Sequence, residues 1–213
     1  MNVNENAPHA GEFDDAPQRR RNLSVNDVAD FLSMRGAKPI VALLSPSGDD
    51  GSTASVMLVR SISELGQSVV LVDMTASGCP TKLMSQEPDL SGISDLLFGD
   101  TAFGEAIHHD RLSSAHIVPK GVAQPRNAIR LIERLTMVLN ALSDSYDTVL
   151  LEFGAADIAG VATLLKYIDA EVILSLPGSD IAAKAEIQLE LQAHGYTDVM
   201  VIGGTQSADP AAE

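Results

Sequence analysis

The sequence predicts an α/β fold, in which a mostly parallel central sheet carries helices on both faces. Short apolar runs bounded by turn residues recur along the chain. Such runs are apolar on both faces of a strand, which is typical of buried strands in parallel sheets. Amphipathic helical patterns separate the runs, as expected for successive strand–helix–strand units with right-handed crossovers.

The first half of the chain alternates as this fold requires. Ser24 and Asp27 have the spacing of a capping box, which predicts a helix that begins there and ends near Gly36. A buried strand is predicted over residues 38–44, and an amphipathic helix over residues 52–65. The run over residues 67–73 predicts the next buried strand.

The second half continues the alternation to the last strand. Strands are predicted around Ile117 and over residues 146–152, 170–176 and 198–203, and helices over residues 127–142, 158–167 and 181–193. Ligands of parallel sheets bind at the carboxyl ends of the strands. We therefore expect a site formed by residues 45–51, Asp73, Glu152 and the loop after Leu176.

Length and composition favour one domain with two tails. The chain has 213 residues, and we expect a folded domain over residues 23–206 between disordered tails at 1–22 and 207–213. The formal net charge is -15, and the basic cluster Arg19-Arg20-Arg21 lies in the N-terminal tail, so we expect no nucleic acid as a partner. No apolar stretch approaches the roughly 20 residues of a spanning helix, so we expect no direct insertion into a membrane.

A degenerate phosphate-binding loop is predicted between the first strand and the next helix. The predicted loop comprises Gly48, Asp49, Asp50, Gly51, Ser52 and Thr53. Its two glycines and its Ser-Thr pair are residue types expected of such a loop. In a working loop, backbone N–H groups cradle the phosphates and a lysine directly precedes the Ser-Thr pair. Here Gly51 takes the position of the lysine, and Asp50 takes that of a glycine. The same pattern is also compatible with an ordinary turn before a capped helix.

The two aspartates of the loop have two interpretations. A helix N-terminus favours negative charge and offers unpaired N–H groups. The carboxylate of Asp49 or Asp50 could therefore lie where a phosphate would bind, so that the loop fills its own site. The alternative is that both are solvent-facing acids with no special role.

Several segments resemble the cytoplasmic domains of the bacterial tyrosine kinases of exopolysaccharide and capsule export, which are MinD/ParA-like P-loop proteins. The most specific match is "PDLSGISDLLFGDTAFGEAI", and "GQSVVLVDM", "HIVPKG" and "YDTVLLEFGAADIAGVATLLKYIDAEVILSL" support it. The resemblance covers nearly all of residues 24–204. It implies that Asp73 and Glu152 stand at the two Walker-type acidic positions, as a vestigial Mg²⁺ site.

This chain differs from the family at the residues that bind nucleotide and carry out phosphoryl transfer. The lysine is absent, the longer Glu152 replaces the Walker B aspartate, and the C-terminal tyrosine cluster is missing. The tyrosines present are Tyr146, Tyr167 and Tyr196, which we place in or near packed elements. We therefore expect no catalytic residues and no bound cofactor, with ATP and Mg²⁺ as ligands only if kinase activity persists.

The resemblance implies a function in exopolysaccharide biosynthesis or export. The expected protein is a pseudo-ATPase that acts by protein contact on a membrane polysaccharide co-polymerase or another export-machinery protein. It would be cytoplasmic, at the inner face of the cell membrane through that partner or a fused membrane segment, and homo-oligomerisation is left open. One alternative is a weakly active tyrosine kinase that takes a lysine from elsewhere, with Lys82 and Lys120 nearest. Another is a MinD/ParA-like positioning factor.

Overall fold

A computed structural model describes residues 23–34, 36–87, 89–123, 131–179 and 181–203. The predicted tails, together with the first residues of the helix expected from residue 127, lie outside these ranges. In chain order the elements are α2 (Val25–Leu32), β1 (Ile40–Leu44), α3 (Asp49–Glu64), β2 (Val69–Asp73), α4 (Cys79–Met84), α5 (Ile93–Phe98), η1 (Phe103–Glu105), β3 (His108–His109), β4 (His116–Val118), α6 (Leu131–Ser143), β5 (Thr148–Glu152), α7 (Ile158–Leu165), β6 (Glu171–Leu176), α8 (Ile181–Ala193) and β7 (Met200–Gly203).

The strands form one mostly parallel sheet, which confirms the predicted fold class. Their order is β3-β4-β2-β5-β1-β6-β7, and among the described strands only β3 and β4 pair antiparallel. The two-residue strand β3 at the edge was not predicted, because it is too short to show any periodicity. Parallel pairing of β1, β2 and β5 brings the carboxyl ends of these strands to one edge of the sheet.

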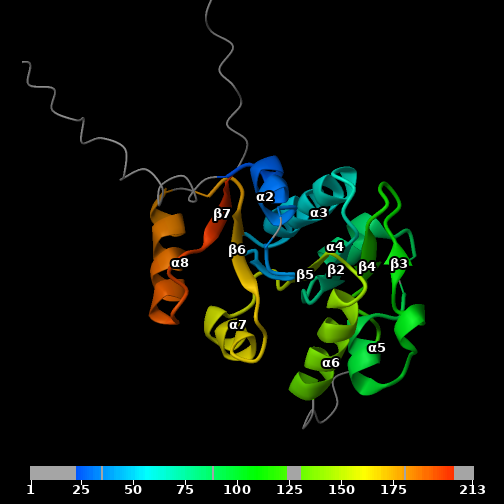
Figure 1. Cartoon of the computed structure of the whole chain (residues 1–213). Coiled ribbons are helices and arrows are strands. Elements are labelled where there is room, and N and C mark those ends of the chain that lie inside the picture. The colour runs from blue at the N-terminus through cyan, green and yellow to red at the C-terminus, as the bar shows by residue number, and fades with distance from the viewer. Residues whose placement is uncertain (1–22, 35, 88, 124–130, 180, 204–213) are drawn as a thin grey trace, which may run out of the picture.

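Helices cover both faces of this sheet (Figure 1). One apolar core packs the sheet against α2, α3 and α4, and the other packs it against α5, α6, α7 and α8. Successive residues of β1 alternate between them, since Val41 and Leu43 belong to the first core and Ala42 and Leu44 to the second. The continuous apolar runs in the sequence are therefore explained by burial on both faces.

Two helix boundaries differ from the prediction by three residues or more. The capping box of α2 is present, with Ser24 Oγ accepting from the Asp27 N–H at 3.1 Å, but the helix ends at Leu32, before Gly36. The helix expected from Ser52 begins three residues earlier, at Asp49. That earlier start converts the predicted phosphate loop into the first turn of α3.

A partly buried ion pair fixes the β3–β4 hairpin against the helix layer. The guanidinium group of Arg60 on α3 donates to both carboxylate oxygens of Asp110, each at 2.9 Å. The Asp110 side chain is fully buried, and Ser113 Oγ donates to the same carboxylate at 2.8 Å. The hairpin that flanks β2 is thus held by contacts far apart in the sequence.

Candidate functional site

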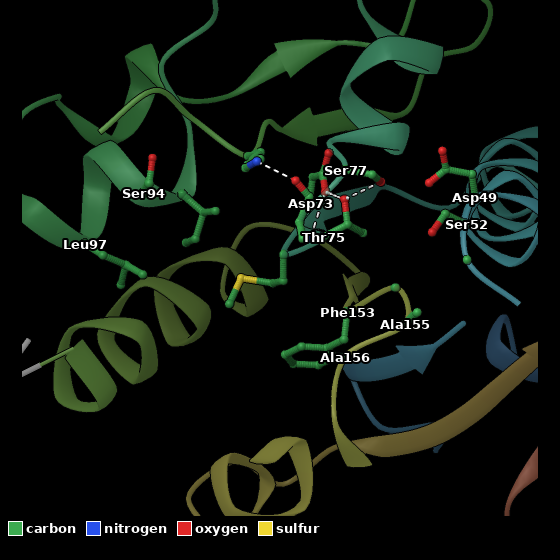
Figure 2. A pocket seen from close by; sticks show the side chains of 16 residues that line it. Asp49, Ser52, Asp73, Thr75, Ser77, Ser94, Leu97, Phe153, Ala155 and Ala156 are labelled. Atoms are coloured by element: carbon green, nitrogen blue, oxygen red, sulfur yellow. Dashed lines mark hydrogen bonds between the residues drawn. The ribbon is translucent and has the colours of Figure 1, made fainter. Parts of the chain in front are cut away.

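A cavity of about 510 Å³ lies at the carboxyl ends of β1, β2 and β5. Its walls come from the start of α3, the segment after β2, the helix α5, and the residues that follow β5 (Figure 2). This is the edge of the sheet at which the sequence predicted a ligand site. Of the predicted site residues, Gly48, Asp49, Ser52 and Asp73 line the cavity, whereas Asp50, Gly51, Thr53 and Glu152 do not.

The predicted phosphate loop is shortened to a tight turn. The Gly48 N–H donates to the Ser45 carbonyl at 2.8 Å, and Gly48 has a φ of 71°, which favours glycine. The Ser52 N–H then donates to the Gly48 carbonyl at 3.1 Å, as in a regular helical turn. Thr53 is exposed, and its hydroxyl donates to the Asp49 carbonyl at 2.8 Å. Backbone groups that would surround a phosphate are therefore partly used within the helix itself.

Asp49 and Asp50 do not fill the site with their own carboxylates. Both side chains are exposed in the first turn of α3, and the N-cap residue Gly48 provides no side-chain cap. Within the described ranges, no N–H group donates to either carboxylate. The hypothesis of a self-filled loop is therefore wrong. Because Asp49 lines the cavity, its carboxylate adds negative charge at the entrance.

Gly51 is packed too tightly to carry a side chain. A Cβ atom at this position would lie 2.6 Å from Ser45 Cβ, 2.8 Å from Ser47 Oγ and 2.9 Å from the carbonyl oxygen of Ser175. The Gly51 carbonyl also accepts from Ser175 Oγ at 2.8 Å, which draws α3 against β6. The position that the motif assigns to a lysine therefore lies inside a packed contact between three elements.

Glu152 is completely buried at the end of β5, beneath the cavity. Its Oε1 accepts from Ser52 Oγ at 3.0 Å and from the Gly154 N–H at 2.9 Å. Its Oε2 has no hydrogen-bond partner, and the buried hydroxyl of Ser45 also has none. Burial raises the pKa of the Glu152 carboxyl, while the nearby hydroxyls of Ser55 and Ser45 and the hydrogen bonds from Gly154 and Ser52 oppose the rise.

Asp73 is buried as well, but its carboxylate is fully partnered. One oxygen accepts from the N–H and hydroxyl of Thr75, at 3.0 and 2.7 Å, and the other from the N–H and hydroxyl of Thr81, at 2.9 and 2.6 Å. Figure 2 shows Thr75 and Asp73 side by side among the residues that line the cavity. These four hydrogen bonds fix the segment between β2 and α4. Within the described ranges, no cluster of three His, Cys, Asp or Glu side chains is placed to hold a metal ion.

Two lysines lie near the segment between β2 and α4. The Lys120 ammonium group donates to the Ala76 carbonyl at 2.6 Å, and that of Lys82 donates to the Ser77 carbonyl at 2.9 Å. Lys120 lines the cavity, whereas Lys82 does not. Of the two lysines named from the sequence, only Lys120 is therefore placed to meet a ligand.

The apolar wall of the cavity was not predicted. It is formed by Met74, Ile93, Leu97 and Phe153, with Ala155 and Ala156 at the exposed end. These residues come from three segments that only the folded chain brings together. One sequence signal was available: "SGISD" forms the start of α5, where the Asp95 carboxylate accepts from the Gly92 and Val122 N–H groups at 2.8 and 3.1 Å.

The strand order and the helix layers give the chain the α/β fold of MinD/ParA-like P-loop proteins. No family model matches the chain, and no curated protein matches it by sequence. Solved structures do match in fold. The VpsO kinase domain superposes with a TM-score of 0.66 at 19% identity, covering 84% of this chain and 92% of that one.

Two further solved structures are similar to the chain in fold. The kinase domain of the Escherichia coli tyrosine kinase ETK matches with a TM-score of 0.65 at 19% identity, covering 86% of this chain and 74% of that one. A ParA family ATPase from Chlorobium tepidum matches with a TM-score of 0.60 at 19% identity, covering 81% of this chain and 76% of that one. At these identities the likeness establishes the fold.

Proposed function

We propose that the chain is a kinase-like domain that has lost nucleotide chemistry and acts by protein contact in exopolysaccharide biosynthesis or export. Its partner would be a membrane polysaccharide co-polymerase or another protein of the export machinery, at the inner face of the cell membrane. The process comes from the motif resemblance, and the fold shared with bacterial tyrosine kinase domains supports it. Within the described ranges, no helix is both long and apolar enough to cross a membrane.

The observation that carries the proposal is the start of α3 at Asp49. Phosphoryl transfer depends on positioning and on neutralising the charge of the phosphates. Here the helix begins with two exposed carboxylates, of which Asp49 lines the cavity. Two unit charges about 4 Å apart interact by about 4 kcal/mol at an effective dielectric constant near 20. A triphosphate in this cavity would meet repulsion of that order from Asp49, reduced by any bound Mg²⁺.

The groups that would hold Mg²⁺ support the same conclusion. The Ser52 hydroxyl, which binds the metal in a working loop, donates to Glu152. All four hydrogen bonds to Asp73 come from Thr75 and Thr81 within the fold. A metal ion would have to displace these four contacts before Asp73 could act as a ligand, whereas the Ser52 hydroxyl donates its hydrogen and keeps its oxygen lone pairs.

Isothermal titration calorimetry with ATP, with and without Mg²⁺, tests the proposal. We expect no saturable heat at millimolar nucleotide. Circular dichroism of the same sample would verify that the domain is folded. A micromolar dissociation constant in the presence of Mg²⁺, about -8 kcal/mol, would overturn the proposal and favour an ATP-dependent enzyme.

A weakly active tyrosine kinase remains the second candidate, because Lys120 lines the cavity and carries a positive charge. One expectation about its substrates must be corrected: Tyr167 is 61% exposed, not packed. Incubation of the purified chain with ATP and Mg²⁺, followed by mass spectrometry, separates the candidates. We expect no phosphotyrosine at Tyr146, Tyr167 or Tyr196. Stoichiometric phosphorylation that is lost in Lys120→Ala would establish the kinase.

The partner proposal has its own test. Co-purification of the tagged chain with a membrane polysaccharide co-polymerase, from cells that express both, should give a complex that persists when nucleotide is removed. Dependence of the complex on ATP would instead favour a MinD/ParA-like positioning factor, whose fold the chain also shares.

A further inference from the structure

The cavity has an apolar wall that faces its charged rim. Met74, Ile93, Leu97 and Phe153 line it together, and Figure 2 shows Leu97 on the side opposite Asp49 and Ser52, with Phe153 between them. The volume of about 510 Å³ falls within the range of about 300–1,000 Å³ found for small-molecule sites. Such sites combine mainly apolar walls with a few polar groups that orient the ligand.

The charges around the cavity disfavour an anion. The Asp49 carboxylate lines the cavity and accepts no hydrogen bond within the described ranges. Asp73 lies at the floor, and Glu152 is buried close behind it at the end of the neighbouring strand. Lys120 is the basic residue in the described lining, and its ammonium group already contacts the Ala76 carbonyl at 2.6 Å. An uncharged ligand avoids the repulsion of Asp49.

One polar group is placed to orient such a ligand. Ser94, in the first turn of α5, lines the cavity, and its Oγ accepts from the Ala123 N–H at 3.2 Å. That contact uses an oxygen lone pair and leaves the hydroxyl hydrogen to donate. A ligand with an oxygen acceptor could therefore bond to Ser94 while its apolar body lies against Leu97 and Phe153.

We propose that this cavity binds an uncharged small molecule that has an apolar body and a hydrogen-bond acceptor, in place of a nucleotide. The inference rests on the proposed loss of nucleotide binding and assigns the vacated site a new ligand class. The apolar wall supplies affinity through burial, and Ser94 supplies orientation. Binding there would contact the start of α3, α5 and the segment after β5 together.

Prodan, a neutral naphthyl ketone whose fluorescence responds to polarity, is a suitable probe. The full chain should bind it saturably at one site, with a blue shift of its emission. Ala156→Trp fills the exposed end of the cavity and should weaken binding at least ten-fold. Ala141→Trp, at an exposed position of α6 outside the cavity lining, is the matched control and should bind as the unaltered chain does. Ser94→Ala should weaken binding about five-fold, the effect of one neutral hydrogen bond.

A second measurement locates the probe even if a variant misfolds. In methyl-labelled methionine spectra of the unaltered chain, prodan should shift the Met74 signal and leave those of Met57 and Met137 in place. Met57 and Met137 are 53% and 70% exposed and do not line the cavity. Unchanged binding in Ala156→Trp, a shift of Met137 instead of Met74, or no binding at all would overturn the inference.

A competition experiment separates this inference from the proposed function. ATP with Mg²⁺ should not displace prodan. Displacement together with saturable ATP binding would overturn both proposals, because the cavity would then be a nucleotide site. Absence of prodan binding together with absence of ATP binding would overturn only the ligand class and leave the pseudo-ATPase proposal standing.

Discussion

Asp73 and Glu152 are paired in register at the carboxyl ends of the neighbouring strands β2 and β5, yet their carboxyl groups have opposite surroundings. Asp73 accepts four hydrogen bonds from Thr75 and Thr81, whereas Glu152 Oε2 accepts none. Both residues are completely buried. The difference arises because the segment after β2 folds back over Asp73, while Glu152 faces the serines of α3 and the β1 end.

The Glu152 carboxyl should make stability depend on pH. Its pKa in the folded state is raised above the ordinary value of 4.5, mainly by burial. The folded state then binds the proton more tightly than the unfolded state does, so stability falls as pH rises from about 4.5 through the folded pKa. Glu152→Gln removes this dependence. Urea unfolding from pH 4 to 8 should show the free energy of unfolding of the variant rising relative to the unaltered chain.

Ser52→Ala is the companion variant for that experiment. It removes the hydrogen bond that Ser52 donates to Glu152 Oε1 and keeps the carboxyl group. The loss of stability with rising pH should therefore persist or grow. A difference between Glu152→Gln and the unaltered chain that stays constant with pH would show that the carboxyl group does not titrate differently on folding.

Asp73→Ala should destabilise the domain by about 3 kcal/mol or more. Hydrogen bonds to charged groups contribute about 1.5–3 kcal/mol each, and the substitution leaves buried donors of Thr75 and Thr81 without an acceptor. Urea unfolding monitored by circular dichroism measures the loss. Asp157→Ala, which removes the exposed N-cap of α7, is the control and should cost only about 1 kcal/mol. Equal losses in the two variants would contradict the structural role of Asp73.

Gly51→Lys restores the motif and should still fail to restore nucleotide binding. The new side chain would collide with Ser45, Ser47 and Ser175, so we expect a destabilisation of about 1–3 kcal/mol, typical of overpacking. Gly51→Ala should show part of the same loss, since the collision begins at Cβ. Calorimetry with ATP and Mg²⁺ and urea unfolding test both points. A stable Gly51→Lys variant with micromolar ATP affinity would show that the loop readily returns to a phosphate-binding form.

Arg60→Met should destabilise the domain by about 3 kcal/mol, because it leaves the Asp110 carboxylate buried without its charged partner. The double variant Arg60→Met/Asp110→Leu should recover part of that loss, since no uncompensated charge remains. A double-mutant cycle by urea unfolding measures the coupling. Additive losses would mean that the hairpin is held by other contacts. Lys38, whose ion pair with Asp169 is exposed, is the control, and Lys38→Met should cost under about 1 kcal/mol.

Much of the architecture could be predicted from the sequence. Residues of β1, β2, β5 and β6 are apolar on both faces, and this pattern alone indicates a parallel sheet between two helix layers. The rule that parallel strands place their carboxyl ends at one edge of the sheet also predicted that Asp73 and Glu152 lie at the same edge. Local spacing was sufficient for the Ser24 capping box, because both of its residues lie within one helical turn.

Only the tertiary structure decided how the site is built. The start of α3 depends on the packing of Gly51 against Ser175, two residues that lie far apart in the sequence. The hydrogen bonds of Asp73 also depend on tertiary structure, because Thr81 contacts it only after the segment between β2 and α4 has folded back. The apolar wall of the cavity combines residues of β2, α5 and the segment after β5. Sequence periodicity reports which side of an element is buried, but it contains no information on which distant segment packs against it.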